Sequence, residues 1–218
     1  LIFKYLSGLA LGGYGMCFYA GGPGSVLFGL FQTYREATLV PVNFWNIARS
    51  LEMRSNDSFF ETEPRTTFRI SNVTLIGNGF QQEVNSGSRR GVRIRTGARG
   101  TLQNMLVTEF PDDGVRIEDL PVTDFGQQMV LSNTFSFNNR RNFEQDAPIF
   151  AQDPNNNVNT NPVAGIGLNN FVGVEPTGFN PSSMGNFFSS AAYAGAVDPS
   201  NDWTADGSWF KNLDGTIR

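Results

Sequence analysis

Short apolar alternations bounded by Gly, Asn, Asp and Pro recur along most of this 218-residue chain. A helical period of about 3.6 residues is hard to find before residue 180. Alternations of this kind are typical of short β-strands joined by tight turns. The pattern therefore predicts an all-β protein.

Four asparagines lie inside similar apolar frames. They are Asn46 in Phe-Trp-Asn-Ile, Asn72 in Ile-Ser-Asn-Val-Thr-Leu-Ile, Asn104 in Leu-Gln-Asn-Met-Leu-Val and Asn133 in Leu-Ser-Asn-Thr-Phe, spaced by 26, 32 and 29 residues. At a tight bend between two strands, Asn readily adopts the left-handed conformation. Its amide can then hydrogen-bond to the equivalent amide one repeat away, at about 4.8 Å. We therefore predict an internal ladder of these four asparagines.

A second element, Gly-Val-Arg-Ile, begins at Gly91 and again at Gly114, 23 residues later. Strand alternation points its Val and Ile side chains inward and its charged side chains outward. Stacking in register would place Arg93 over Arg116 and Arg95 over Glu118. The outward strip that this predicts consists of Arg93, Arg95, Asp112, Asp113, Arg116, Glu118 and Asp119.

An irregular repeat of about 20 to 35 residues is typical of a solenoid, because each coil buries its apolar face only against its neighbours. We expect a right-handed parallel β-helix, with its coils within residues 1–150. Residues 151–218 begin with a polar linker and continue with a segment rich in Gly, Pro and aromatic residues. We expect this part to form an irregular C-terminal cap that covers the exposed strand edges.

Composition removes several function classes. The net charge of −4 argues against nucleic-acid binding. The absence of His excludes Ser-His-Asp and Cys-His catalysis and His-based metal sites, and the single Cys17 excludes an internal disulfide. Residues 5–34 carry no charged side chain, but their many glycines disfavour a transmembrane helix. We do not expect a membrane span.

The C-terminal segment resembles the end of large bacterial surface proteins, labelled hypothetical proteins or lipoproteins, of Bacteroidota and Proteobacteria. The similar elements are Phe187-Phe188, residues 193–199, Asp202-Trp203-Thr204 and Trp209, and the strand around Asn72-Val73-Thr74-Leu75 is also similar. The resemblance implies a parallel β-helix at the extracellular or outer-membrane surface, with further sequence ahead of Leu1. It implies other protein subunits or surface glycans as partners.

The charged strip is the candidate glycan- or ion-binding site. Pectate-lyase-like β-helices bind Ca²⁺ through clustered carboxylates beside an Arg or Lys base. However, Asp112-Asp113-Gly114 is also an ordinary turn, and charged side chains are expected on any exposed face. We therefore expect a non-enzymatic surface scaffold for adhesion, assembly or glycan contact, with no catalytic residue or cofactor. The alternatives are a Ca²⁺-dependent carbohydrate-active enzyme and a membrane-associated subunit held by residues 5–34.

Overall fold

The structure is a computed structural model of the chain. It describes residues 2–10, 16–18, 23–33, 49–77, 79–80, 89–145, 156–167, 172, 178–198 and 200–202, and only the backbone up to residue 50. These residues contain no α-helix, and their two short 3-10 helices span Val122–Asp124 and Pro181–Met184. The predicted all-β class is confirmed.

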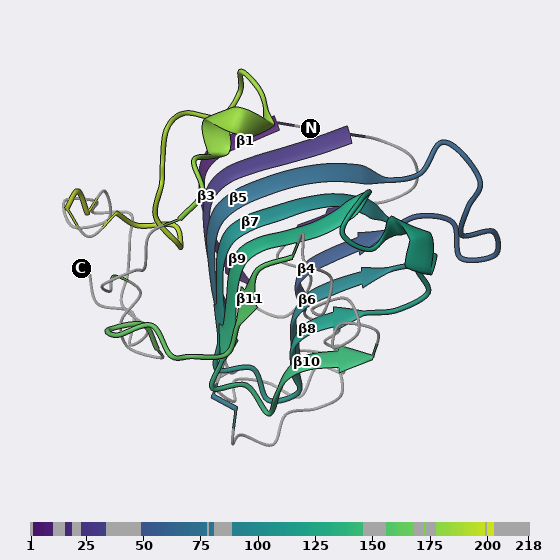
Figure 1. Cartoon of the computed structure of the whole chain (residues 1–218). Helices are drawn as coiled ribbons and strands as arrows, with labels where there is room; N and C mark the ends of the chain where they lie inside the picture. The colour runs from purple at the N-terminus through teal and green to yellow at the C-terminus, as the bar shows by residue number, and fades with distance from the viewer. Residues whose placement is uncertain are drawn as a thin grey trace.

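The strands belong to two parallel sheets, which the chain visits in turn (Figure 1). The first sheet has the order β1 (Ile2–Ala10), β3 (Pro23–Thr33), β5 (Thr67–Ile76), β7 (Arg99–Thr108), β9 (Met129–Phe137) and β11 (Val158–Asn159). The second has the order β10 (Arg141–Gln145), β8 (Asp113–Ile117), β6 (Arg90–Arg95), β4 (Arg49–Arg54) and β2 (Met16–Phe18).

One apolar core lies between the two sheets. The first sheet contributes fully buried residues such as Phe68 and Ile70. In the second sheet, the inward direction predicted for the Gly-Val-Arg-Ile element is confirmed, because Val92, Ile94 and Val115 are fully buried in the same cluster. Burying one such side chain contributes about 1.5–3 kcal/mol to stability.

The long strands β5, β7 and β9 each bend at an asparagine (Figure 1). Asn72, Asn104 and Asn133 have φ angles of 55°, 56° and 51°, in the left-handed region. Asn tolerates this region better than most residues, because its short polar side chain can hydrogen-bond locally. The sequence therefore places the bend at the same point of each repeat.

The bend shifts the alternation of side chains by one residue. In β5, Phe68 and Ile70 point into the core before the bend, and Val73 and Leu75 point into the same core after it. An unbroken strand would have sent the second pair to the opposite face. Asn72 therefore allows one strand to line the core along both arms of the bend.

The described part of the C-terminal segment packs on the outer face of the first sheet. Ile76 of β5 forms an apolar cluster with Ala196 and Val197, and Leu106 of β7 forms another that includes Ala194. Both strands are interior members of the sheet. These contacts of the C-terminal segment therefore cover a face of the first sheet.

The prediction of a right-handed parallel β-helix closed by a C-terminal cap is wrong. The described residues form two parallel sheets, and no closed solenoid is found among them. Each repeat has two strands, and the returns between them differ greatly in length, as residues 55–66 and 96–98 do. In addition, β11 extends the first sheet beyond residue 150, where the linker was expected to begin.

Residues 5–34, the candidate membrane segment, include most of β1 and all of β2 and β3. Within the ranges that the structure describes, no helix is long and apolar enough to cross a membrane.

Candidate functional site

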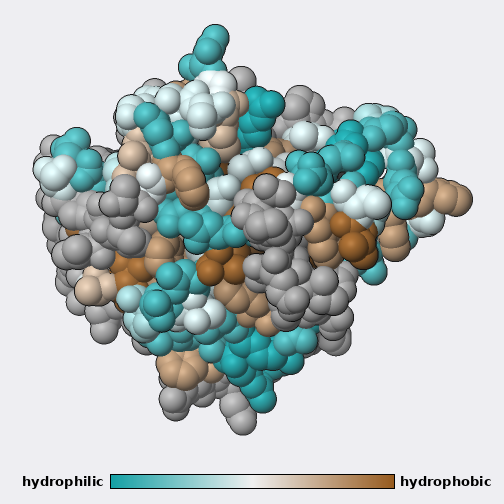
Figure 2. All heavy atoms as spheres, viewed as in Figure 1, coloured by the Kyte–Doolittle hydropathy of each residue, from teal (hydrophilic) through white to brown (hydrophobic). Residues whose placement is uncertain are grey.

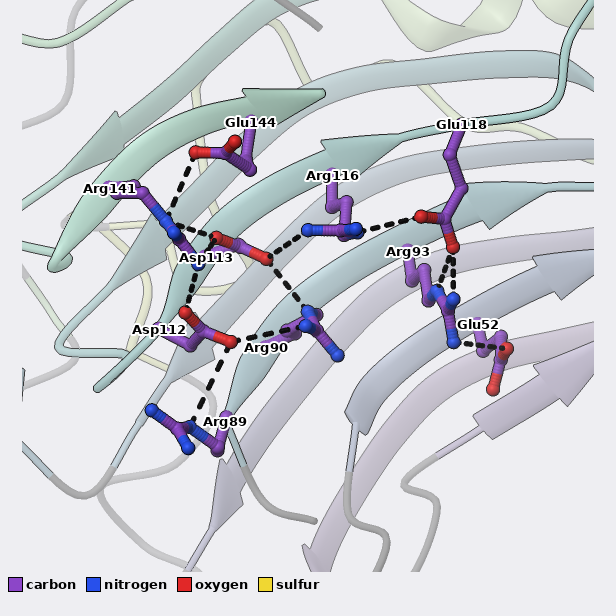
Figure 3. A network of polar contacts seen from close by, with 10 residues as sticks. All are labelled: Glu52, Arg89, Arg90, Arg93, Asp112, Asp113, Arg116, Glu118, Arg141 and Glu144. Carbon is purple, nitrogen blue, oxygen red and sulfur yellow. Dashed lines mark hydrogen bonds and ion pairs between the residues drawn. The ribbon is translucent and has the colours of Figure 1, made fainter. Parts of the chain in front are cut away.

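An arginine–carboxylate network covers the outer face of the second sheet (Figure 3). Its members are Glu52, Arg89, Arg90, Arg93, Asp112, Asp113, Arg116, Glu118, Arg141 and Glu144. The structure thus brings together five of the seven residues of the predicted strip and adds five more.

Strand register builds the network. Arg93 lies opposite Arg116 across β6 and β8, as predicted, and this register is confirmed. Glu52 lies opposite Arg93 on one side, and Glu144 lies opposite Arg116 on the other. The row thus has an acidic residue at each end, of which Glu52 pairs with Arg93, whereas Glu144 pairs with Arg141.

Asp113 is the most enclosed carboxylate of the network. Its side chain has no exposed area, and it accepts hydrogen bonds from Nε of Arg90 at 2.7 Å and Nε of Arg141 at 2.8 Å. Nη1 of Arg116 lies 3.4 Å from the same carboxylate. A buried charge is tolerated only when it is paired and hydrogen-bonded, and three guanidinium groups meet that need.

Asp112 shares two of these arginines with its neighbour. Arg141 donates to it, and Nη2 of Arg90 lies 3.2 Å from its Oδ2. Nε of Arg89 is farther away, at 3.8 Å. Because Arg90 and Arg141 lie between the two adjacent carboxylates, they offset the repulsion that would otherwise separate them.

Glu118 joins the central pair of arginines. It accepts from Arg93, and Nε of Arg116 donates to its Oε2 at 2.8 Å. Burial acts to raise the pKa of Glu118, but hydrogen bonds and charges from Arg116 and Arg93 outweigh it and hold the pKa below its ordinary value. Glu118 therefore keeps its negative charge to a lower pH than an ordinary glutamate does.

The predicted pair of Arg95 and Glu118 is wrong. Arg95 instead donates to Asp57, with its Nη2 at 3.2 Å from Oδ1. The side chain of Glu118 points toward Arg93 and Arg116 (Figure 3). Register placed the two residues side by side, but loop 55–66 supplies a competing carboxylate that the sequence does not locate.

Asp119, the remaining member of the predicted strip, lies apart from the network. It is exposed and has a φ of 57° in the turn after β8. Its carbonyl oxygen accepts a hydrogen bond from the N–H of Gly97 at 3.0 Å. Asp119 therefore contributes to the turn through its backbone and not to the network.

Three of the four predicted ladder asparagines are linked by side-chain hydrogen bonds. Nδ2 of Asn133 donates to Oδ1 of Asn104 at 3.1 Å, and Nδ2 of Asn104 lies 3.4 Å from Oδ1 of Asn72. Asn46 lies outside the described residues. The pairing of β11 with β9 places Asn157 opposite Asn133, a position that sequence analysis did not assign.

The ladder faces the C-terminal segment and not the core between the sheets. Nδ2 of Asn72 donates to the carbonyl oxygen of Tyr193 at 2.7 Å. Nδ2 of Asn104 donates to the carbonyl oxygen of Phe179 at 2.6 Å, and its Oδ1 accepts from the N–H of Phe179 at 3.0 Å. The amides therefore satisfy backbone groups of a segment that has little regular structure.

A buried ion pair between Arg65 and Asp124 is not predicted by the sequence patterns. Their side chains are only 5% and 3% exposed, and Nε of Arg65 also donates to the carbonyl oxygen of Gly97 at 2.6 Å. This arginine therefore joins the loops of three successive repeats. Nothing in the local sequence signals this, because the two partners are 59 residues apart.

Sequence signals could have found part of the network that was missed. Arg90 and Asp113 each directly precede the Gly-Val-Arg-Ile element. Extending the alignment of the two elements by one residue places these opposite charges next to each other. Strand β10, which begins with Arg141, lacks the Gly-Val-Arg-Ile element, so only the structure shows that it lies beside β8.

The chemistry of the network is dominated by charge compensation. Each of its carboxylates lies within ion-pair distance of an arginine. Among the residues that the structure describes, no group of three or more His, Cys, Asp or Glu side chains is placed to hold a metal ion.

Comparisons of the chain with protein-family models, curated proteins and solved structures find no match.

Proposed function

We propose that the protein is a non-enzymatic structural scaffold that serves adhesion, assembly or glycan contact. The observation that carries this proposal is the arginine–carboxylate network. Its two aspartates, Asp112 and Asp113, each contact several arginines. Such an arrangement ties together neighbouring strands of a sheet and supports a rigid surface.

The same arrangement weighs against a Ca²⁺-dependent carbohydrate-active enzyme. Calcium needs several carboxylate or carbonyl oxygens directed at one point. Here the carboxylate oxygens of Asp113 are directed at guanidinium groups of Arg90, Arg116 and Arg141 (Figure 3). A proton-abstracting arginine would also need a lowered pKa. The pKa of Arg116 is instead raised, because the hydrogen bonds and charges of Glu118 and Asp113 outweigh burial, which acts to lower it.

The location and the partners are part of the same proposal. We propose an extracellular or outer-membrane surface location, on the basis of the resemblance of the C-terminal segment to bacterial surface proteins. The partners would be other protein subunits or surface glycans, which a charged face can recognise through complementary charge.

An assay of polysaccharide cleavage tests this proposal. The protein is incubated with acidic polysaccharides, with and without Ca²⁺, and the release of unsaturated uronides is followed. We expect no release under either condition. Calcium-dependent release that Arg116→Ala abolishes would overturn the proposal in favour of the enzyme.

A further inference from the structure

Loop 55–66 protrudes from the end of the second sheet (Figure 1) and ends in an acidic aromatic tip, which we define as residues 57–63. Phe59 is 67% exposed and Phe60 is 36% exposed. Asp57, Glu61 and Glu63 flank them and are also exposed. Figure 2 shows hydrophobic surface at this protruding end.

The tip is held in place by hydrogen bonds. Oδ1 of Asn56 accepts from the N–H groups of Ser58 and Phe59, at 2.9 and 3.1 Å. The N–H of Thr62 donates to the carbonyl oxygen of Phe59 at 3.2 Å, and the buried pair of Arg65 anchors the end of the loop. An exposed phenylalanine on an ordered turn loses little conformational entropy when it binds.

Ion pairs at the tip expose their carboxylates. The side chains of Asp57 and Glu63 are 49% and 59% exposed, whereas those of their partners Arg54, Arg95 and Arg99 are 20%, 21% and 24% exposed. The tip therefore presents negative charge and aromatic rings to the solvent.

The opposite end of the same sheet shows the reverse arrangement. We define the arginine face as Arg89, Arg90 and Arg141, where the network begins. The side chains of Arg141 and Arg89 are 45% and 31% exposed, whereas Asp112 and Asp113 beneath them are 9% and 0% exposed. This end therefore presents guanidinium groups to the solvent.

The two surfaces lie at opposite ends of the same strands. In β6, Arg90 contributes to the arginine face, and Arg95, five residues later, pairs with Asp57 at the tip. Five residues of a strand span about 16 Å. The tip of one molecule therefore cannot reach the arginine face of the same molecule without leaving its anchored position.

We propose that the acidic aromatic tip of one copy of this chain docks on the arginine face of a second copy. The exposed carboxylates complement the exposed guanidinium groups, and Phe59 can stack on a guanidinium plane. The inference rests on the proposed scaffold role, because it names the partner that the scaffold assembles with.

Such a contact has a distinctive geometry. It joins two different surfaces, so a copy that docks through one of them keeps the other available, either for the same partner or for a third copy. Docking in which each copy binds a different neighbour builds rings or open filaments, whereas reciprocal docking of two copies closes a two-fold symmetric dimer.

Sedimentation velocity of the chain tests the proposal. We expect concentration-dependent association that weakens when the salt is raised from about 0.05 M to about 0.5 M. Glu61→Lys combined with Phe59→Ser should weaken association at least about tenfold, and so should Arg141→Glu. Thr160→Lys, at an exposed site near β11, is the charge control and should associate like the unchanged chain.

A mixture of the two variants gives the sharpest result. The tip variant, Glu61→Lys with Phe59→Ser, retains an intact arginine face, and Arg141→Glu retains an intact tip. Together they should form a one-to-one complex that grows no further. A monomeric unchanged chain at low salt, or association that either variant leaves unaltered, would overturn the contact. Arg89→Glu repeats the test in case Arg141→Glu disturbs folding, which circular dichroism reports.

Failure of this inference can be distinguished from failure of the proposed function. A chain that is monomeric and releases no uronides refutes self-docking and leaves the scaffold role standing. Release of uronides refutes the scaffold role, whatever the state of association.

Discussion

Two regions of this protein pair arginine with carboxylate, in opposite ways. Arg65 and Asp124 are nearly fully buried, and each has the other as its charged partner in the structure. In the network on the second sheet, the aspartates each meet several arginines at a partly exposed surface. The buried pair therefore depends on a single contact, whereas the surface network has several that can substitute for one another.

This difference determines what each region does for the fold. Breaking a buried pair leaves an uncompensated charge away from water, which is strongly destabilising. Removing one member of a partly exposed network leaves charges that other members and water can compensate. The Arg65 pair should therefore dominate stability, and the network should mainly shape the surface.

The largest effect is expected for Asp124→Ala. This change leaves the Arg65 guanidinium buried without its carboxylate and should destabilise the protein by about 3–5 kcal/mol. Urea unfolding followed by tryptophan fluorescence measures the loss. A cost below about 1 kcal/mol would show that water reaches the site and would remove the contrast with the network.

The double variant Arg65→Met with Asp124→Leu is the control. Replacing both charges by apolar groups of similar size removes the unpaired charge. We expect this variant to be more stable than Asp124→Ala.

The next largest loss of stability is expected at an uncharged buried contact, that of the Asn104 amide with the backbone of Phe179. Asn104→Ala removes hydrogen bonds to Phe179 and places Ala at a φ of 56°. A lost buried hydrogen bond and the left-handed conformation together should cost about 2–4 kcal/mol. Urea unfolding measures the cost, and limited proteolysis should show faster cleavage of the segment around residue 179.

Asn104→Gly separates the two contributions. Glycine accepts the left-handed conformation and lacks only the amide, so it should cost less than Ala. Equal costs for Ala and Gly would mean that the backbone angle contributes nothing.

A smaller effect is expected for Glu118→Gln, and it depends on pH. The pKa of Glu118 is lowered in the folded state, so its ionised form contributes stability above the ordinary carboxyl pKa. That contribution, below about 1 kcal/mol, is lost as the pH falls through the lowered pKa. Unfolding at pH 7 and at acidic pH should therefore show a difference between the variant and the unchanged protein only at pH 7.

Glu109→Gln should respond to pH in the opposite direction. Burial raises the pKa of Glu109, although hydrogen bonds from the Phe80 backbone and the Asn138 side chain act to lower it. The ionised form therefore costs stability at neutral pH, and this cost is relieved as the pH falls through the raised pKa. If the two variants responded to pH in the same direction, one of the two assignments would be wrong.

The smallest effect is expected for Arg95→Ala. Its partner Asp57 is half exposed, so the pair should contribute only about 0–0.5 kcal/mol, and less at high salt. Unfolding at two salt concentrations checks this. A loss above about 1 kcal/mol would place Arg95 with the buried pair instead of the surface.

Sequence patterns predict the strands of this protein better than their surroundings. The asparagine frames mark the long strands β5, β7 and β9, and the Gly-Val-Arg-Ile element gives β6 and β8 together with their mutual register. Both predictions rest on local alternation, which a strand must obey. Contacts made by loops follow no such period, so the partners of Arg65 and Arg95 could not be assigned.

The fold was misjudged because repetition does not specify how the strands connect. Repeated strands predict parallel neighbours, and the sheets are parallel. Whether the returns close a coil depends on loops such as residues 55–66, whose path composition does not determine. The repeated element likewise predicts a charged outer strip. It does not predict Arg89, Arg90 or Arg141, because none of these residues is part of the element.

The asparagine amides also specify the register between neighbouring long strands. If β7 slipped by one residue along β5, Asn104 would lie opposite Ser71 or Val73. The slipped strand would lose its amide partner, and its core-facing side chains would turn to the opposite face. Because Asn104 also meets Asn133 of β9, a shift of β7 would break amide contacts with both of its neighbours.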